Sequence, residues 1–532
     1  MKGNTQPRGN FGIMRWGTPI VSAAEMRALD RATIEEDGVP SLILMERAGQ
    51  GVFRHLCEWF SPIQGRRVAI IVGKGNNGGD GLVVVRYLHE AGASVHLWLA
   101  TDPSEFTGDA AVQWHIVRAY DIPALPIPPN PDPALFREEE VLVDALLGTG
   151  LQGEVREPYR TLIEVMNQSE RPIVAVDIPS GLDADTGREL GIAIRATYTV
   201  TMALPKLGFF QNAGPRCVGK WVAVPIGIVP RRMADLQSAA RLLNARDIGA
   251  MLPAWSPDAH KGHRGHVLVV GGSPGMVGAP ALAGISALRV GAGLATVATP
   301  ARIQPQVASF YPELMTIPLP DGDTGALTRD GVRYLSERWA RYDVLALGPG
   351  LGQLAPTESA IGELLSLWSQ RERPLVIDAD GLNWMARLGG EGPLPPWTVL
   401  TPHPGEAARL LQIATHQVQE DRLNVAALLH ERYGATIVLK GAYSVITDGS
   451  DTWIVPFAEP SLATGGSGDV LTGAIAGLLA QGLAPREAAL AGAYLHAAAG
   501  ATLACEGHAP YTADELSRAL VNALRSRAVS LQ

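Results

Sequence analysis

Residues 68–81 read VAIIVGKGNNGGDG, a short apolar strand that runs into a glycine-rich loop and then into the start of a helix. From Gly73 the glycines satisfy the GxGxxG spacing, at which a backbone can approach an anion that faces free helix N–H groups. That spacing alone is weak, because a tight strand-to-helix turn without a ligand gives the same pattern. The Asn76 and Asn77 pair and Asp80 favour a binding loop.

Short β-branched runs alternate with helical stretches on both sides of this segment. In the first half the runs are residues 67–72, 95–99, 141–146, 173–177, 197–203 and 221–225. After a polar, arginine-rich stretch at 231–246 the alternation begins again, with runs at 266–270, 294–298, 344–347, 375–378, 399–401 and 436–439. This rhythm is typical of mostly parallel, doubly wound sheets.

The chain is too long for one hydrophobic core, since cores stop growing near roughly 250–300 residues. We therefore expect an α/β protein of two doubly wound domains. Residues 1–14 are interpreted as a loose tail, 15–232 as the first domain and 245–528 as the second. The two halves share a class but no alignable repeat, which favours a fusion over a duplication.

Two helices are expected before the first strand. Ser22-Ala23-Ala24-Glu25 has the pattern of a capping box, in which the Ser and Glu side chains each satisfy a free backbone N–H group. A second helix is expected to follow Pro40, with apolar residues at helical spacing.

Composition excludes several classes of function. The formal net charge of −9 gives no electrostatic basis for binding nucleic acid or an anionic membrane, and no apolar run of about 18 residues lacks Gly, Pro or charge. Cys57, Cys217 and Cys505 have neither CxxC spacing nor a disulfide pattern. We expect a cytoplasmic enzyme that binds small molecules, with no nucleic-acid or membrane partner, and a homo-oligomer.

Two further carboxylates follow predicted strands of the first domain: Asp144 in VDALLGTGLQG and Asp177 in VDIPSGLDADTG. Because the carboxyl ends of parallel strands converge on the ligand crevice, these side chains are expected to lie near the glycine loop. A lone Asp in such a place more often caps a helix. The oxygens of Asn77, Asp144 and Ser180 are hard ligands that suit an alkali or alkaline-earth cation.

The second domain carries its own loop, ATGGSGDV at residues 463–470, before an apolar helical stretch. Its N–H groups would form an anion hole beside Asp469, an arrangement that suits phosphoryl transfer. An ordinary capped helix is the alternative. No GxxxxGK[ST] occurs, which excludes a P-loop kinase.

GNNGGDGL, VDALLGTGLQG and VDIPSGLDADTG, in this order, resemble the NAD(P)H-hydrate epimerase domain, over roughly residues 15–230. The resemblance implies a Rossmann-like fold that equilibrates the R and S epimers of hydrated NADH or NADPH, with Asp177 acting as acid or base. It implies K⁺ bound at Asn77, Asp144 and Ser180. The substrate contacts that it implies are Asn76, Asn77, Gly78, Gly79, Asp80, Gly148, Thr149, Gly150, Leu151, Gln152, Gly153, Glu154 and Asp177.

The GxGD loop resembles that of the ribokinase superfamily. With KGHRGHVLVVGGSPGMVGAPALAG, LGPGLG, IDADGLN and LKGAYSVI, the second half resembles the ADP-dependent NAD(P)H-hydrate dehydratase domain, over roughly residues 245–525. Where kinases of small vitamins commonly have TPNxxEA, this chain has His403 in TPHPGEA. The first domain's product would be the second domain's substrate.

The second resemblance implies that the S hydrate is phosphorylated by ADP and then loses phosphate, giving AMP, phosphate and NADH or NADPH. Asp469 would be the general base, Mg²⁺ would accompany ADP, and Glu406 would position the ion or its water. The implied contacts to the hydrate are Ala279, Gly350, His403 and Asp469. The implied contacts to the adenine nucleotide are Lys440, Gly441, Ala442, Tyr443, Ser444, Gly465, Gly466, Ser467 and Gly468.

Two other functions remain open from the residues. A ribokinase-like vitamin or sugar kinase with an appended nucleotide-binding domain would share the GxGD loop, although His403 stands against it. Alternatively, the first domain is a non-catalytic scaffold. His403 between prolines also fits a structural turn, and Asp378 or Asp380 fits a helix cap.

Overall fold

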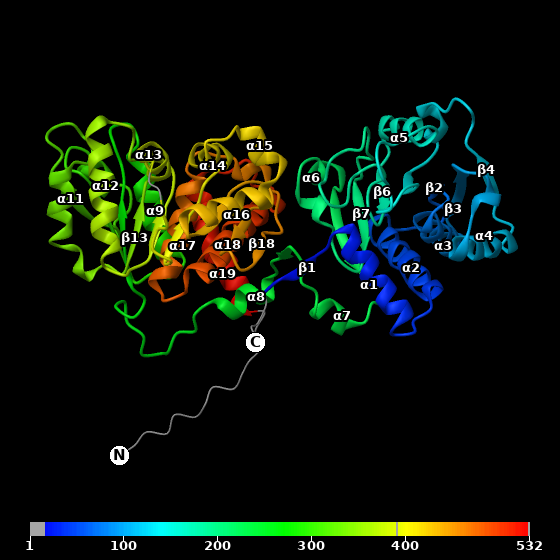
Figure 1. The fold of residues 1–532 in the computed structure, drawn as a ribbon, viewed down its shortest axis with the longest axis horizontal. Helices are drawn as coiled ribbons and strands as arrows, with labels where there is room; N and C mark the ends of the chain where they lie inside the picture. Colours follow the sequence, from blue (N-terminus) through cyan, green and yellow to red (C-terminus); the bar gives the residue numbers. More distant parts are fainter. Residues whose placement is uncertain (1–15, 390–391, 530–532) are drawn as a thin grey trace, which may run out of the picture. The chain divides into compact units, whose positions relative to one another are not determined.

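The computed structural model describes residues 16–389 and 392–529, which form two compact units. Of the described residues, the N-terminal unit comprises Pro19–Ala240 with Gln419–Arg422, and the C-terminal unit comprises those at 16–18, 241–418 and 423–529. Each unit is a sheet covered by helices on both faces (Figure 1). The prediction of two doubly wound α/β units is confirmed.

The N-terminal unit contains a seven-stranded sheet in the order β4-β3-β2-β5-β6-β7-β8, in which all neighbouring strands are parallel. Its strands are β2 (Arg67–Val72), β3 (Ser94–Leu99), β4 (Ala124–Pro126), β5 (Val141–Ala145), β6 (Ile173–Val176), β7 (Tyr198–Met202) and β8 (Lys220–Val224). Its helices are α1 (Ala23–Glu35), α2 (Ser41–Trp59), α3 (Asn76–Glu90), α4 (Gly108–Ala119), α5 (Tyr159–Gln168), α6 (Gly214–Cys217) and α7 (Pro230–Ala234).

Alternating strand residues explain why both faces of this sheet are covered. On β2, Ile70 and Val72 belong to one buried cluster with residues of α2 and α3, whereas Ala69 and Ile71 belong to another with residues of α5. Strands that are buried on both faces consist of nearly continuous apolar residues, which is the pattern in the sequence.

A second, 11-stranded sheet has the order β1-β9-β18-β17-β16-β15-β14-β13-β10-β11-β12, and its strands β10 to β18 lie in the C-terminal unit. Its strands are β1 (Thr18–Ile20), β9 (Ala240–Leu242), β10 (His266–Val270), β11 (Leu294–Pro300), β12 (Met315–Leu319), β13 (Val344–Leu347), β14 (Leu375–Ile377), β15 (Thr398–Leu400), β16 (Thr436–Leu439), β17 (Val445–Thr447) and β18 (Thr452–Ile454). Strands β10 to β16 pair in parallel, and β17 is antiparallel to both its neighbours.

The helices of this unit also cover two faces. They are α8 (Ala245–Met251), α9 (Gly278–Arg289), α10 (Gln304–Ala308), α11 (Arg329–Ser336), α12 (Ala355–Ser369), α13 (Asp380–Leu388), α14 (Pro404–Leu411), α15 (Thr415–Glu420), α16 (Arg422–Tyr433), α17 (Ser467–Ala480), α18 (Pro485–Cys505) and α19 (Ala513–Val529). One buried cluster joins the sheet to α9, α17, α18 and α19, and another joins it to α11, α12, α13, α14 and α16.

The predicted start of α1 is confirmed. Ser22 is the N-cap, its Oγ accepts a hydrogen bond from Glu25 N at 3.1 Å, and Glu25 Oε2 accepts one from Ser22 N at 2.7 Å. Helix α2 follows Pro40, as expected.

Residues just before β1 differ from the sequence-based division. Trp16 O accepts hydrogen bonds from Arg241 Nε at 2.9 Å and Trp453 Nε1 at 3.1 Å, and Gly17 N donates to Asp247 Oδ2 at 2.7 Å. Trp16, Gly17 and Thr18 therefore belong to the C-terminal unit, whereas the sequence analysis placed residues from 15 onward in the first domain.

Helix α18 has the length and apolar composition of a membrane span, but 72% of its most apolar window is buried inside the protein. It packs against α17 and α19 in the same apolar cluster. Its composition is therefore explained by its place in the core.

Candidate active sites

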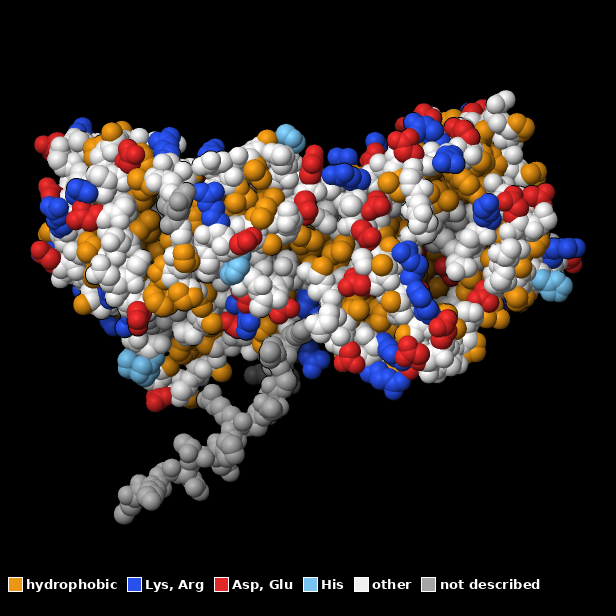
Figure 2. Space-filling model, viewed as in Figure 1, with side chains coloured by type: hydrophobic (Ala, Val, Ile, Leu, Met, Phe, Trp, Pro, Cys, Tyr) orange, Lys and Arg blue, Asp and Glu red, His pale blue; other side chains and the backbone are white. Residues whose placement is uncertain are grey.

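The N-terminal unit contains a cavity of about 610 Å³ at the carboxyl ends of β2, β5 and β6. In Figure 2 this unit shows a recess in which acidic and apolar side chains are visible. Among the predicted substrate contacts, the cavity is lined by Asn76, Asn77, Asp80, Gly148, Thr149, Gly150, Leu151, Gln152 and Asp177. The structure places Gly78, Gly79, Gly153 and Glu154 outside its wall.

The glycines of the first loop serve packing more than ligand approach. A Cβ on Gly78 would lie 1.8 Å from Gly73 O, and one on Gly73 would lie 2.0 Å from Leu146 O. These contacts require glycine for α3 to pack against the ends of β2 and β5. Gly75 has open space around its missing Cβ and is therefore free to face a ligand.

Asp177 follows β6 in the left-handed region, at φ 65°, and its side chain is 15% exposed. Its Oδ1 accepts hydrogen bonds from Met202 N at 2.9 Å, Thr201 Oγ1 at 3.1 Å and Lys206 Nζ. Lys206 is fully buried and also donates to Thr201 Oγ1 at 2.8 Å and Met202 O at 3.2 Å. The ammonium group therefore fixes the carboxylate in one orientation.

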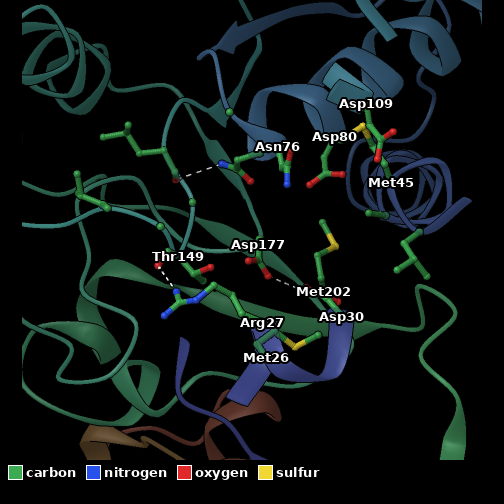
Figure 3. A pocket seen from close by; sticks show the side chains of 18 of the residues that line it. Met26, Arg27, Asp30, Met45, Asn76, Asp80, Asp109, Thr149, Asp177 and Met202 are labelled. Atoms are coloured by element: carbon green, nitrogen blue, oxygen red, sulfur yellow. Dashed lines mark hydrogen bonds between the residues drawn. The ribbon is translucent and has the colours of Figure 1, made fainter. Parts of the chain in front are cut away.

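Two more carboxyl groups lie beside Asp177. Asp30 on α1 and Asp80 on α3 line the same cavity, and Figure 3 shows all three around one space. Burial raises the pKa of Asp30 to about 6, with the charge of Asp177 adding to the effect and Lys206 opposing it. Burial, Asp177 and Asp30 also raise the pKa of Asp80 well above its ordinary value.

Neither Asp30 nor Lys206 was found from the sequence. Asp30 lies inside a helix with ordinary amphipathic spacing, and Lys206 lies in ALPKLG without a motif around it. Lys206 follows β7, the strand beside β6, so it reaches Asp177 only through the pairing of these two strands.

The three predicted cation ligands come together around the backbone of Leu147. Asn77 Nδ2 donates to Leu147 O at 3.1 Å, and Ser180 Oγ accepts from Leu147 N at 2.9 Å. Asp144, fully buried, accepts from Ser180 Oγ at 2.6 Å and Ser180 N at 2.8 Å. Burial raises the pKa of Asp144 to about 6, although these hydrogen bonds oppose the effect.

This donor set fits an alkali cation. Asn77 Oδ1 is buried and has no hydrogen-bond partner among the described residues, which is costly unless another group occupies its lone pairs. Within the same described ranges, no group of three or more His, Cys, Asp or Glu side chains is arranged to hold a metal. Amide, hydroxyl and single carboxylate oxygens are suited to a hard ion such as K⁺.

In the C-terminal unit the predicted residues follow neighbouring parallel strands. Gly350 follows β13, Asp378 follows β14, His403 follows β15 and Lys440 follows β16, so their loops share one edge of the sheet. A Cβ on Gly350 would lie 3.1 Å from Ala279 Cβ at the start of α9, so these two predicted hydrate contacts are neighbours.

Lys440 is the centre of the charged cluster at this edge. Its Nζ lies 2.5 Å from Asp378 Oδ1 and 3.8 Å from Glu406 Oε2, and Asp378 Oδ2 accepts a second hydrogen bond from Thr472 Oγ1 at 2.7 Å. Burial acts to lower the pKa of Lys440, but Asp378 and Glu406 outweigh it and raise that pKa. Lys440 therefore carries its charge, and Asp378 has a role beyond the helix cap considered for it, since α13 has Ala379 as its N-cap.

Asp469 is the third residue of α17, and its side chain is half-buried. Burial raises its pKa to about 7, Asp378 adds to the effect and Lys440 opposes it. Gly466, the N-cap, adopts φ 89°, which favours glycine, and a Cβ on Gly468 would lie 3.4 Å from Lys440 Nζ. The helix start therefore faces Lys440 with its free N–H groups, as an anion hole requires.

His403 and Glu406 form a reciprocal cap at the start of α14. His403 Nδ1 accepts from Gly405 N at 3.0 Å, and Glu406 Oε2 accepts from His403 N at 2.8 Å. Burial and the charges of Lys440 and Arg409 lower the pKa of His403, which keeps the ring neutral. Burial raises the pKa of Glu406 to about 7 against the opposing charge of Lys440. The cap uses Nδ1, and Nε2 lies 3.4 Å from Glu406 Oε1.

The remaining predicted nucleotide contacts lie on two loops. Gly441, Ala442, Tyr443 and Ser444 join β16 to β17, where Tyr443 adopts φ 52° and its N–H donates to Phe457 O at 2.9 Å. Gly465 and Ser467 lie at the start of α17, where Ser467 Oγ lies 3.1 Å from His496 Nε2.

The chain is similar to two protein families along most of its length. Residues 41–208 match the family described as YjeF-related protein N-terminus, and residues 267–522 match the family described as NAD(P)H-hydrate dehydratase.

Proteins similar over nearly the whole chain include the bifunctional NAD(P)H-hydrate repair enzyme Nnr of Moorella thermoacetica, 44% identical over 90% of this chain and 92% of the relative. The protein of the same name from Coxiella burnetii is 39% identical over 92% of this chain and 96% of the relative. A solved ADP/ATP-dependent NAD(P)H-hydrate dehydratase from Bacillus subtilis, co-crystallized with ATP and Mg²⁺, is 30% identical with a TM-score of 0.46, covering 54% of this chain and 98% of that one.

Proposed function

The chain belongs to the bifunctional NAD(P)H-hydrate repair enzymes, and on that premise we propose that its two units act in sequence on one damaged cofactor. The N-terminal unit equilibrates the R and S epimers of hydrated NADH and NADPH. The C-terminal unit converts the S epimer to NADH or NADPH at the expense of ADP. The observation that carries this function is that each unit bonds a lysine to one aspartate, in a pocket where the pKa of a neighbouring carboxyl group is raised.

Asp177 is the fixed acid–base residue of the epimerase site. Epimerisation at C6 of the nicotinamide ring requires the C6 oxygen to leave and to return, so a proton must move to and from that oxygen. The bond from Lys206 and the bonds from Thr201 and Met202 keep Asp177 in place in the cavity wall. The open backbone at Gly75 leaves room for the ligand beside it.

We assign a potassium ion to Asn77, Asp144 and Ser180. The buried, unpartnered Asn77 Oδ1 and the buried Asp144 support this assignment. K⁺ would supply positive charge beside Asp144, and these side chains would at the same time hold the loop that begins at Leu147.

Asp469 is the general base of the dehydratase site. It takes the proton from the C6 hydroxyl while that oxygen attacks the terminal phosphoryl group of ADP, and AMP leaves with the electrons of the broken P–O bond. Backbone N–H groups of the loop at residues 465–468 and the charge of Lys440 stabilise the phosphoryl oxygens. The C–O bond then breaks, phosphate leaves, and a ring proton is lost to give the reduced cofactor.

Mg²⁺ fits this site with ADP, because the ion neutralises charge on transferring phosphoryl groups. Asp378 and Glu406 are the hard oxygen donors beside Lys440, and both are almost fully buried. Carboxyl oxygens are suited to the ion or to its water molecules.

Two single substitutions test both activities. D177N is expected to abolish exchange between purified R and S hydrates but to leave ADP-dependent return of reduced nicotinamide absorbance from the S epimer intact. D469N is expected to do the reverse. D235N, at an exposed residue at the end of α7, serves as the matched control.

The wild-type enzyme decides between this function and the alternatives. If it converts neither hydrate with ADP present, the proposed function is refuted. In that case, ATP-dependent phosphorylation of hydroxymethylpyrimidine would favour the vitamin kinase. In a separate test, epimer exchange that is unchanged in D177N would favour a scaffold role for the N-terminal unit.

We also propose a reducing, cytoplasmic location. Cys57, Cys217 and Cys505 are all free thiols in the structure, which supports it.

A further inference from the structure

Asp30 is a carboxyl group of the N-terminal cavity that lacks a structural role. It lines the cavity from α1, and its Oδ1 is buried with no hydrogen-bond partner among the described residues. Its neighbour Asp177, in contrast, accepts three hydrogen bonds on one oxygen. A buried carboxyl oxygen without a partner costs free energy, so its retention in a cavity wall points to a ligand.

Several charged groups surround Asp30 in the cavity. Asp80 and Asp177 face it from α3 and the end of β6, and Lys206 is the buried cation beside them. Arg27 on its own helix donates to Thr149 O at 3.4 Å, and Lys74 and Asp109 also line the cavity. Burial raises the pKa of Asp30 to about 6, the charge of Asp177 adds to the effect and Lys206 opposes it, so Asp30 carries a proton over part of the neutral range.

Epimerisation needs proton transfer on both faces of the ring, because the oxygen leaves from one face and returns to the other. Asp177 is fixed by three donors and cannot follow the oxygen from face to face. On the basis of the proposed epimerase function, we propose that Asp30 is a second acid–base group of this site, working with Asp177.

The step balances as follows. One carboxyl group, Asp30 or Asp177, gives its proton to the C6 hydroxyl, the C–O bond breaks with its electron pair on the departing water, and the ring nitrogen lone pair forms a conjugated iminium. Water then adds to the other face, forming a new C–O bond, and the other carboxylate accepts the surplus proton. Exchange of that proton with solvent resets the pair, and the reverse reaction uses the two groups in exchanged roles.

The test compares wild type, D30N and D30E by following the interconversion of purified R and S hydrates chromatographically between about pH 5 and 8. D30N is expected to slow exchange by about 10²-fold to 10⁴-fold with the KM for the hydrate little changed, and to lose the dependence on pH near 6. D30E is expected to recover part of the rate. ADP-dependent conversion of the S epimer in the same samples is expected to be unchanged, and calorimetry reports whether the N-terminal unit is folded.

Wild-type exchange by folded D30N, or a loss confined to KM, overturns the role of Asp30. Failure of wild type and D235N to exchange the epimers refutes the proposed epimerase function itself, so the two failures are distinguishable.

A separate observation concerns the C-terminal unit, where a hollow of about 280 Å³ is lined by Gln353, Asn383, Ala386, Arg387 and Arg409. Two guanidinium groups and no carboxylate line it, although the whole chain has a net charge of −9. The arginines are held in place, since Arg409 Nη1 donates to Asn383 Oδ1 at 2.8 Å and Arg387 lies 5.0 Å from the ring centre of Trp384.

This hollow adjoins the proposed dehydratase site. Asn383 Nδ2 lies 3.3 Å from Asp380 Oδ1, and Asp380 Oδ2 accepts from Gly352 N at 2.8 Å, two residues after Gly350. The charge of Arg409 also lowers the pKa of His403. On the basis of the proposed dehydratase function, we infer that Arg387 and Arg409 bind a phosphate group of the hydrated dinucleotide, away from its reacting ring.

R387A and R409A are expected to raise the KM for the S hydrate by about tenfold or more each, and to leave kcat and the KM for ADP unchanged. R525A, on the exposed side of α19, is the matched control. A larger effect on the hydrate of NADPH than on that of NADH assigns the site to the 2′-phosphate, and equal effects assign it to the pyrophosphate. A rise in the KM for ADP, or no change in either KM, overturns the inference. Absence of ADP-dependent conversion in wild type refutes the dehydratase function instead.

Discussion

If Asp469 is the general base of the dehydratase, kcat/KM must fall as the pH falls through its pKa. That pKa is about 7, because burial and Asp378 raise it and Lys440 only partly opposes them. A base acts in its ionised form, so the group is about half active at pH 7 and about one-tenth active at pH 6. The expected profile is level above about pH 8 and loses about tenfold per unit below about pH 6.5.

The phosphate of ADP itself titrates at about pH 6. The fall in kcat/KM at low pH therefore does not by itself identify Asp469. D380N separates the two. The carboxylate of Asp380 raises the pKa of Asp469, and asparagine removes that charge while keeping an oxygen that can accept from Gly352 N. In D380N the fall in kcat/KM is therefore expected to occur at lower pH, whereas the pKa of ADP is unchanged.

The assay follows the return of reduced nicotinamide absorbance from purified S hydrate at saturating ADP and constant ionic strength. D330N, on the exposed start of α11, is the control for loss of one negative charge far from the site. If kcat/KM falls only below about pH 5, or falls at the same pH in D380N as in wild type, the assignment of Asp469 as a base with a raised pKa is refuted.

Three more outcomes follow from the N-terminal unit. K206M leaves Asp177 without its cation and is expected to lower the free energy of unfolding by about 3–5 kcal/mol, which calorimetry of that unit measures; an unmoved transition contradicts it. G78A places a Cβ 1.8 Å from Gly73 O and is expected to cost at least about 1–3 kcal/mol in denaturant unfolding, whereas G75A, with open space, should cost far less; equal losses would contradict this packing argument. N77A removes the unpartnered Oδ1 and is expected to raise the K⁺ concentration needed for half-maximal epimer exchange by about tenfold or more, and wild-type K⁺ dependence would count against the ion site.

Many of the strands could be predicted, because the evidence for them is local in the sequence. Apolar runs such as residues 67–72 and 266–270 coincide with β2 and β10, since strands buried on both faces must be continuously apolar. Strands β17 and β18 were missed. They have three residues each and form an antiparallel hairpin at a point where the parallel rhythm stops.

The glycine motif predicted where the loop lies, but not why its glycines are required. Its glycines were interpreted as allowing a phosphate to approach, yet Gly78 is needed because its neighbour Gly73 passes so close. Asp30 and Lys206 could not be predicted, because they join Asp177 only through the packing of α1 and the pairing of β7 with β6. Proximity between elements far apart in the chain leaves no spacing in the sequence.

The two sites solve one electrostatic problem in the same way. Each has a lysine that bonds to an aspartate, Lys206 to Asp177 in one unit and Lys440 to Asp378 in the other, and Lys440 also lies 3.8 Å from Glu406. One ammonium cannot neutralise several carboxyl groups in a low dielectric, so burial leaves the others with raised pKa values, near 6 for Asp30 and near 7 for Asp469.

The two raised pKa values predict that the two activities decline at different pH. Dehydration needs Asp469 ionised and declines below about pH 7, whereas epimer exchange needs Asp30 in both forms and is fastest near its pKa, about 6. Between these values epimerisation should outpace dehydration, and the S hydrate should remain replenished while the C-terminal unit limits the rate. Equal decline of both activities over that interval would mean that the lysine–carboxylate pairs do not set the ionisation of their neighbours.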